Sequence, residues 1–313
     1  MKKILSDILI CPACLPREEP LTLRAKVSEG DEILEGSLSC RHCGRAFSIS
    51  EGIAYLDPEE TPGSREEANR YEQEEVVSSY IWSHYGDLLA DEEASEAYSQ
   101  WSARQRPHPG LALDMGAAVG RFTFEMAQRC ELAVGLDNSH AFIKTARRLM
   151  QEGEITVRLK EEGLLSREIT VRLPAGWQRD RLDFIVADAQ RVPFASQSFT
   201  SCASLNLVDK LPQPLAHLRE MNRLVTDAKG QFLFSDPFSW SPEAAEPEEW
   251  LGGTKEGPAA GWGLTNISNW LAGGEQGLGP AWQVEETGHV WWKIRSHRNH
   301  FELIRSCFIK AAR

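Results

Sequence analysis

Strand-like and helix-like segments alternate along residues 111–236, and this alternation constrains the fold more than any other feature of the sequence. Short apolar runs typical of buried strands are separated by amphipathic stretches typical of helices. The predicted strands are 111–115, 132–137, 184–188, 201–206 and 231–236, and the predicted helices are 121–130, 139–151 and 213–225. Since parallel strands require crossover connections, the pattern predicts an α/β fold with an open, doubly wound, Rossmann-like sheet.

The segments that interrupt or follow this alternation have their own patterns. Residues 155–159 and 169–173 resemble the two arms of an extra hairpin within an insertion. Residues 237–281 are rich in Gly, Pro, Glu and Trp, which predicts a long irregular excursion over the active face. Two apolar segments, 290–294 and 301–311, are expected to be strands that complete the sheet.

The amino-terminal third is organised differently. Residues 1–57 contain alternating segments and paired cysteines, which predicts a small β-rich unit. After a break marked by Pro58 and Pro62, residues 58–110 are expected to form a mainly helical connector that acts as a cofactor lid. Residues 111–313 then form the main domain, so the chain is expected to have three parts.

Two Cys-x-x-Cys pairs predict a metal site in the β-rich unit. Two tight knuckles can bring four thiolates together tetrahedrally, and zinc is the natural occupant of such a site. The predicted ligands are Cys11, Cys14, Cys40 and Cys43. Four reduced buried cysteines, or a redox role for one pair, remain the alternatives. Because the unit is too small for a substantial core, we expect the metal to hold it folded.

Charge and hydropathy limit the partners and the location. The formal net charge is −12, and an acidic body repels phosphate backbones, so nucleic acid is disfavoured as a partner. Asp7 interrupts a short apolar opening, and no run approaches the ~18 apolar residues of a membrane helix. We therefore predict a cytoplasmic protein without a membrane partner, and the sequence leaves the oligomeric state open.

Acidic residues end successive predicted strands, which indicates a binding site. The first strand ends in Asp114 and a glycine-bearing turn, the second in Asp137 and the third in Asp188. Glycines let a ligand approach the backbone, and an acid after the second strand typically holds ribose hydroxyls. A carboxylate beside the first turn repels a pyrophosphate but suits a ligand with an ammonium and a sulfonium, such as S-adenosylmethionine. Strand-end acids can also be plain turn formers.

Residues 1–57 resemble a small zinc-ribbon family. The resemblance lies in Leu9-Ile-Cys-Pro-Ala-Cys14, the segment 38–47 around the second cysteine pair, and the Gly-Ile-x-x-Leu sequence at 52–56. Members of this family activate tRNA, ribosomal RNA and release-factor methyltransferases as a separate subunit or as a fused domain. The resemblance implies that the zinc is structural and not catalytic.

Nearly all of residues 111–313 resemble the class I S-adenosylmethionine-dependent methyltransferases. The resemblance implies that Asp137 binds the ribose and that Asp188 with Ala189 faces the adenine. It also implies that the methionine end is lined by Gly116, Ala118 and Gly120. The predicted cofactor residues are Asp114, Gly116, Ala118, Gly120, Asp137, Asn138, Asp188, Ala189 and Asn206, of which Asn206 borders the sulfonium. Two departures are Ala118, in place of a glycine, and Thr200, where the family often has Asp.

Catalytic residues are harder to predict, because methyl transfer depends mainly on aiming a nucleophile in a dry pocket. The candidates are His84 and Tyr85, in a segment that the resemblance places over the cofactor, and Asp209 after the fourth strand. A helix N-cap role explains Asp209 equally well. Tryptophans at 240, 250, 262 and 270 could wall a substrate pocket or anchor the excursion to the core.

The predicted function is transfer of a methyl group to a small polar molecule by in-line displacement. Residues 291–303 resemble a subset of these enzymes that includes mercaptohistidine N-methyltransferase-like domains. One alternative is an RNA methyltransferase that uses the zinc ribbon to bind RNA. Residues 1–57 carry seven basic and nine acidic side chains, which favours the small molecule. The other alternative is a cofactor-binding regulator without catalytic activity.

Overall fold

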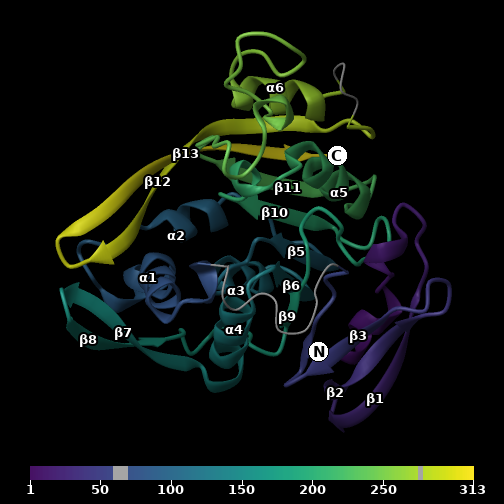
Figure 1. Ribbon diagram of the computed structural model, residues 1–313, viewed down its shortest axis with the longest axis horizontal. Coiled ribbons are helices and arrows are strands. Elements are labelled where there is room, and N and C mark those ends of the chain that lie inside the picture. The colour runs from purple at the N-terminus through teal and green to yellow at the C-terminus, as the bar shows by residue number, and fades with distance from the viewer. Residues whose placement is uncertain (59–69, 274–277) are drawn as a thin grey trace.

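The computed structural model describes residues 1–58, 70–273 and 278–313, and it is built around a seven-stranded sheet (Figure 1). The strand order is β12-β13-β11-β10-β5-β6-β9. Their bounds are β5 Leu111–Met115, β6 Leu132–Asp137, β9 Leu182–Val186, β10 Ser201–Leu205, β11 Gln231–Asp236, β12 Gln283–His297 and β13 His300–Ala312. All neighbouring pairs among β9, β6, β5, β10 and β11 are parallel, which confirms the predicted α/β sheet.

The strand order places a topological switch beside β5. From β5 the chain moves to β6 and β9 on one side, then returns to β10 and β11 on the other. The crossovers on the two sides run in opposite directions, which opens a crevice at the carboxyl ends of β5 and β10. β13 pairs antiparallel with β11 and with β12, so the last two strands complete the sheet as a long hairpin.

The predicted crossover helices form close to their expected positions. Their bounds are α3 Arg121–Ala127, α4 His140–Glu152 and α5 Pro214–Leu224. α4 begins where the Ser139 side chain accepts a hydrogen bond from the Phe142 N–H, and it ends at Gly153, whose φ is +79°. These are a side-chain N-cap and a left-handed glycine C-cap, which explains why the boundaries of α4 were predictable.

The connector contains short helices, as expected, within the part of it that the structure describes. These are η3 Arg70–Glu72, α1 Glu74–Tyr85, η4 Gly86–Leu89 and α2 Ala97–Ser102. The expected insertion hairpin also forms, as β7 Glu154–Glu162 and β8 Leu165–Arg172. α1 contacts both β7 and β12, so the connector lies between the two hairpins.

The excursion over residues 237–281 does not lie where the sequence analysis placed it. Its described part contains η6 Pro247–Glu249 and α6 Gly263–Leu271, and α6 packs against β12 and β13. α6 accordingly sits beyond the β12–β13 edge of the sheet in Figure 1. Buried Ile267, Trp270 and Leu271 anchor it there, because they belong to the apolar core of the main domain.

The amino-terminal unit is a four-stranded antiparallel sheet, which confirms the predicted β-rich unit. Its elements are η1 Lys3–Asp7, η2 Pro12–Cys14, β1 Leu21–Glu29, β2 Glu32–Cys40, β3 Ala46–Ser50 and β4 Ile53–Ala54. We call this unit, residues 1–57, the ribbon. Most of β1 is exposed, whereas β2 alternates between buried and partly exposed positions.

The ribbon docks on the edge of the main sheet. Directly after β4, Tyr55 forms a parallel bridge with Val186 of β9, and the Leu56 N–H donates to the Val186 carbonyl. Near the amino terminus, Leu9 forms an antiparallel bridge with Phe194. The ribbon therefore pairs with the main domain through backbone hydrogen bonds at two places.

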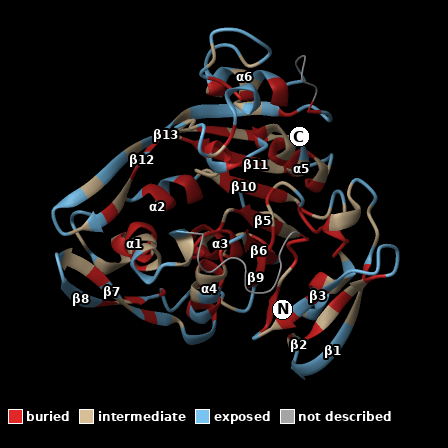
Figure 2. Ribbon diagram, viewed as in Figure 1, coloured by how far each residue is buried: buried red, intermediate tan, exposed pale blue. Residues whose placement is uncertain are grey.

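Burial shows that the two parts share one apolar core (Figure 2). Leu9, Leu38 and Phe47 of the ribbon belong to the same buried cluster as Phe194 and Phe199 of the main domain. This packing therefore contributes to the stability of the ribbon, beside the metal that we expect its cysteines to hold. Within the described residues, no helix is long and apolar enough to cross a membrane.

Candidate functional site

The ribbon cysteines converge on one point, as the sequence predicted. The sulfur atoms of Cys11, Cys14, Cys40 and Cys43 all lie within 4.8 Å of one another. The Cys43 N–H lies 3.5 Å from the Cys40 sulfur, and Gly44, with φ +75°, donates its N–H to the Cys40 carbonyl. This is a tight knuckle whose amide points at a thiolate, and four such sulfurs fit a tetrahedral zinc ion.

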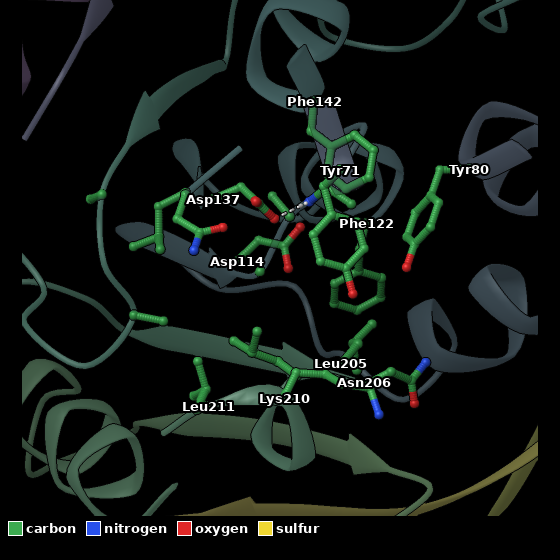
Figure 3. A pocket seen from close by; sticks show the side chains of 18 of the residues that line it. Tyr71, Tyr80, Asp114, Phe122, Asp137, Phe142, Leu205, Asn206, Lys210 and Leu211 are labelled. Carbon is green, nitrogen blue, oxygen red and sulfur yellow. Dashed lines mark hydrogen bonds between the residues drawn. The ribbon is translucent and has the colours of Figure 1, made fainter. Parts of the chain in front are cut away.

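A second site lies at the carboxyl edge of the main sheet, where a cavity of about 280 Å³ opens (Figure 3). Residues from the ends of β5, β6, β9 and β10 line it, together with side chains of the connector. Of the predicted cofactor residues, the cavity lining contains Asp114, Gly116, Ala118, Asp137, Asn138, Asp188, Ala189 and Asn206. The crevice at the switch point thus gathers residues from across the domain.

The turn after β5 shows how the backbone shapes this cavity. Gly116 and Ala118 have φ values of +77° and +46°, and the Ala118 N–H donates to Asp137 Oδ2 at 2.9 Å. Ala118 therefore adopts the left-handed conformation that a glycine would favour. Gly120, in contrast, is absent from the cavity lining. It directly precedes α3, has a φ of +85°, and a Cβ at this position would lie 2.7 Å from Phe184 Cζ. Close packing therefore explains why residue 120 is a glycine.

Two carboxyl groups, those of the buried Asp114 and the partly buried Asp137, belong to the cavity lining. Burial raises the pKa of Asp114 to about 7, with a further rise from the nearby Asp137, although the Thr123 hydroxyl donates to it at 2.7 Å. Burial also raises the pKa of Asp137 to about 6, against the opposing hydrogen bonds from Ser139 and Ala118. Burial is the main cause of both shifts, and a cationic ligand beside the two carboxyl groups would favour their charged forms.

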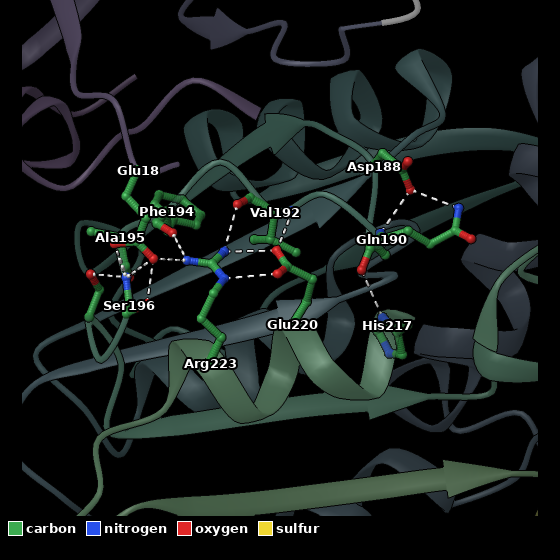
Figure 4. A network of polar contacts seen from close by, with 12 residues as sticks. Glu18, Asp188, Gln190, Val192, Phe194, Ala195, Ser196, His217, Glu220 and Arg223 are labelled. Atoms are coloured by element: carbon green, nitrogen blue, oxygen red, sulfur yellow. Dashed lines mark hydrogen bonds and ion pairs between the residues drawn. The ribbon is translucent and has the colours of Figure 1, made fainter. Parts of the chain in front are cut away.

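The loop after β9 forms one wall of the cavity and is held from two sides (Figure 4). Asp188 Oδ1 accepts from the Gln190 N–H at 2.9 Å, which fixes the loop start. The Ala189 carbonyl lies 2.9 Å from His217 Nδ1 of α5, and burial lowers the pKa of His217 to about 4. A neutral His217 can therefore donate from Nδ1 to Ala189 while its Nε2 accepts from Ser204 at 2.8 Å.

The far end of the same loop is held by the ribbon. Arg223 of α5 donates to the carbonyls of Val192 and Phe194, and to Glu18 of the ribbon at 2.9 Å. Glu18 also accepts from the backbone N–H of Ser196 at 3.1 Å. A charged bridge therefore connects the ribbon to the loop whose beginning lines the cavity.

Asn206 lies directly after β10, at the wall of the cavity opposite the loop that follows β9. Its φ of +56° is unusual outside glycine, although Asn tolerates this region better than most residues. Its Oδ1 accepts from the Ser306 hydroxyl at 2.6 Å, and Ser306 accepts from Trp292 Nε1 at 3.1 Å. These bonds orient the amide with its oxygen toward β13.

The structure separates the three catalytic candidates. His84 lines the cavity, but Tyr85 and Asp209 do not. The Tyr85 hydroxyl donates to the Val119 carbonyl at 2.8 Å in the core, and Asp209 Oδ2 accepts from the Ser239 N–H at 2.8 Å. Both side chains therefore have structural partners outside the cavity.

The tryptophans of the excursion also lie elsewhere, and no described residue of 237–281 lines the cavity. Trp240 stacks on Phe238 and on Trp250, Trp270 is buried, and Trp262 is 82% exposed. Anchoring therefore explains Trp240, Trp250 and Trp270, and the expectation of an excursion over the active face was wrong. Thr200, the other family departure, donates its hydroxyl to the Pro109 carbonyl at 3.0 Å.

Sequence reasoning missed several lining residues, chiefly Asp57, Tyr71, Tyr98, Lys210 and Trp292. Asp57 follows the ribbon strand that pairs with β9, so the pairing of two distant segments brings it to the cavity. Tyr98 and Trp292 were visible only as aromatic residues within an expected helix and strand. Their position depends on how the connector packs against β12, for which the sequence carries no local signal.

Comparisons with known proteins agree with the two-part organisation. Residues 113–234 match the model of the methyltransferase domain family, and residues 2–52 match the model of Trm112p-like proteins. No curated protein matches the chain.

Solved structures with a similar fold include three with low sequence identity. The complex of the Haloferax volcanii Trm112 methyltransferase activator with a methyltransferase is 18% identical, covering 51% of this chain and 60% of that one, with a TM-score of 0.36. YcgJ from Bacillus subtilis is 13% identical, covering 69% and 96%, with a TM-score of 0.44. An Aquifex aeolicus methyltransferase is 10% identical, covering 75% and 96%, with a TM-score of 0.44.

The sheet order and the cavity at the switch point agree with the match of residues 113–234 to the methyltransferase domain model, and the sheet is like that of class I methyltransferases. The chain thus joins a segment similar to methyltransferase domains to an amino-terminal segment similar to Trm112p-like proteins.

Proposed function

We propose that the cavity binds S-adenosylmethionine and presents it to a small-molecule acceptor. In this proposal Asp137 and Asn138 hold the ribose, Asp188 and Ala189 face the adenine, and Asp114, Gly116 and Ala118 surround the methionine end. Asn206 borders the sulfonium. The observation that carries the proposal is that the ends of β5 and β6 bring two carboxyl groups, those of Asp114 and Asp137, into the lining of one cavity, where a cationic ligand would favour their charged forms.

The chain contributes orientation and exclusion of water. S-adenosylmethionine supplies an already activated methyl group, so a positioned acceptor in a dry cavity needs little further chemical assistance. Phe122 is buried, and the Tyr80 and Phe142 rings lie 4.7 Å apart, which makes much of the cavity wall apolar. We infer that these side chains limit access of water to the methyl group.

Charge supports a small-molecule acceptor over RNA. Among the described lining residues the only basic side chain is Lys210, and its Nζ lies 3.2 Å from the buried Asp209 carboxylate. A phosphate backbone would need a basic path from the ribbon to the cavity. The ribbon instead contributes the acidic Asp57 to the cavity lining.

Titration calorimetry with S-adenosylhomocysteine tests the cofactor site. Binding is expected, and Asp137→Asn is expected to weaken it at least tenfold, because the amide cannot accept two ribose hydroxyls as a carboxylate does. Asp180→Asn, at an exposed turn outside the cavity lining, is the matched control and is expected to bind normally. Binding of a nicotinamide dinucleotide, with no heat from S-adenosylhomocysteine, would contradict the proposal.

Two further measurements separate the alternatives. An RNA methyltransferase would bind a ribosomal or transfer RNA fragment in fluorescence anisotropy at physiological salt, whereas we expect no saturable binding. A regulator without catalytic activity would bind the cofactor but release no S-adenosylhomocysteine with any small acceptor, whereas we expect turnover.

A further inference from the structure

The end of the cavity formed by the connector and β12 is aromatic. Tyr80 and Tyr98 from the connector, Phe122 from α3 and Trp292 from β12 all belong to the lining. Figure 3 shows Tyr80 and Asn206 at one side of the cavity and Asp137 at the other. We call these four aromatic residues the aromatic chamber. It lies next to Asn206, which borders the sulfonium under the proposed function.

Fixed contacts hold the chamber in shape. Tyr98 OH and His84 Nε2 are 2.8 Å apart, and their ring centroids are 4.5 Å apart. The buried Arg121 guanidinium donates to the His84 carbonyl at 2.8 Å and to Asp87 at 2.6 Å, which ties α1 and η4 to α3. Trp292 is held through Ser306, as described above. The rings are therefore positioned before any ligand binds.

The lining of the whole cavity contains more acidic than basic side chains. Four carboxyl groups, those of Asp57, Asp114, Asp137 and Asp188, belong to the cavity lining, and Lys210 is paired with Asp209. His84 is 5% exposed and adds no positive charge, because burial and the nearby Arg121 lower its pKa to about 3. Its Nδ1 has no hydrogen-bond partner within the described residues.

The type of acceptor atom decides where the positive charge goes during transfer. With a neutral amine, the nitrogen lone pair forms the new N–C bond, the C–S bond breaks, and its electron pair stays on sulfur. The positive charge of the sulfonium thereby moves to the acceptor nitrogen. With a carboxylate, phenolate or thiolate the charges cancel instead, and a site must first hold the anionic acceptor with a cation.

We propose that the acceptor is a small molecule with a neutral amine or N-heterocycle nitrogen, methylated inside the aromatic chamber. This inference rests on the proposed function and adds the acceptor class. Aromatic faces attract a cation, most strongly when it is desolvated, and the lining carboxylates add to that attraction. The chamber thus stabilises the charge that forms on nitrogen. An anionic acceptor would meet no unpaired basic side chain within the described lining.

A matched series of ligands tests the charge preference without knowledge of the natural acceptor. Protein saturated with S-adenosylhomocysteine is titrated with choline, with its neutral carbon isostere 3,3-dimethyl-1-butanol, and with the anion 3,3-dimethylbutanoate. Choline is expected to bind at least tenfold more tightly than the alcohol, and the carboxylate is expected not to bind. Equal affinities, no binding by any of the three, or preference for the carboxylate overturns the amine acceptor.

Variants of two adjacent tryptophans test whether choline binds inside the aromatic chamber. Trp292→Leu is expected to weaken choline binding about tenfold, whereas Trp292→Phe keeps an aromatic face and most of the affinity. Trp291→Leu is the control, because Trp291 is half exposed and lies outside the cavity lining. Equal loss in the Trp291 and Trp292 leucine variants would place the choline outside the chamber and overturn the proposal.

A turnover assay complements the binding data. Release of S-adenosylhomocysteine is measured with pooled amines and imidazoles, and separately with pooled phenols, thiols and carboxylates. Turnover confined to the nitrogen pool is expected, and turnover confined to the other pool overturns the inference. Failure of S-adenosylhomocysteine itself to bind would instead overturn the proposed function, so the two failures are distinguishable.

Discussion

At the scale of single residues, Asp114 and Asp137 determine how the cavity responds to pH. Both have pKa values raised above their unfolded values, so between about pH 4 and 7 the folded protein retains protons that the unfolded chain has released. Their contribution to stability is therefore largest below pH 4 and is lost as pH rises through 6 and 7. A cationic ligand favours the charged carboxylates and reverses this trend.

Ligand binding should therefore strengthen with pH. We expect the affinity for S-adenosylhomocysteine to rise between pH 5.5 and 8, because at the lower pH the ammonium ligand must displace protons. Calorimetry across this range measures the slope, and Asp114→Asn is expected to flatten it. A slope that is the same in Asp114→Asn and the wild type would show that Asp114 does not face the ligand.

Backbone conformation at Ala90 gives a stability prediction. Ala90 is exposed and follows η4 with φ +51°, a left-handed conformation that costs an alanine about 1 kcal/mol. Ala90→Gly is expected to raise the free energy of unfolding by about 0.5–1 kcal/mol in urea denaturation. Ala103→Gly is the control, because exposed Ala103 has φ −60° and glycine should lower stability there. A loss at both positions would contradict the argument.

The positions of residues in the cavity lining were predictable from sequence where the signal is local. Asp137 and Asp188 end buried strands, so the strand pattern was sufficient to bring them to one edge. Gly120 is an exception, because the turn motif placed it among the predicted cofactor residues, whereas in the structure a glycine is required there by close packing against Phe184. Trp292 lines the cavity although the sequence analysis did not predict it there. Its position depends on the packing of the β12–β13 hairpin against the connector, which no local sequence signal specifies.

At the scale of elements, the main strands and helices could be predicted because each has a clear hydrophobic period and clear ends. The excursion over residues 237–281 could not be placed, because a Gly- and Pro-rich segment has no periodic face that specifies its partner. Its helix α6 packs on β12 and β13 through apolar residues, and apolar residues would equally be expected in a lid over the cavity. Only tertiary packing decides between the two positions.

The contact between α4 and the ribbon gives a prediction at this scale. Arg147 of α4 is 2% exposed, and it pairs with Glu32 of the ribbon at 2.6 Å and with Asp183 of β9 at 3.1 Å. Arg147→Met is expected to cost about 3 kcal/mol of unfolding free energy, because the buried Asp183 loses its arginine partner and keeps the backbone N–H donors of Lys2 and Phe184. Denaturation monitored by circular dichroism measures this.

The neighbouring arginine provides the control. Arg148 is exposed and pairs only with Glu152 of the same helix within the described residues. Arg148→Met is expected to change the unfolding free energy by less than about 0.5 kcal/mol. Similar losses for the two variants would show that the ribbon contact contributes little.

At the scale of the whole molecule, the ribbon and the methyltransferase domain form one cooperative structure. They share an apolar core, two backbone pairings and the bridge between Glu18 and Arg223. The sequence predicted each part but not their contact, because a docking surface has no period or spacing of its own. This contact also explains how Asp57 of the ribbon comes to line the cavity.

Removal of the metal should therefore affect the cofactor site. Chelation of zinc is expected to lower the melting temperature and to weaken S-adenosylhomocysteine binding at least tenfold, because the loop 188–196 loses its ribbon contacts. Differential scanning calorimetry and titration calorimetry measure the two effects, and added zinc should restore both. Unchanged ligand affinity in the chelated protein would show that the loop keeps its shape without the ribbon.

The parallel pairing of Tyr55 and Leu56 with Val186 also has a consequence for assembly. Because residues of the same polypeptide already cover the outer edge of β9 at this position, a separate chain finds no vacant strand edge there to extend. The covalent link also fixes the ratio of the ribbon to the main sheet at one to one.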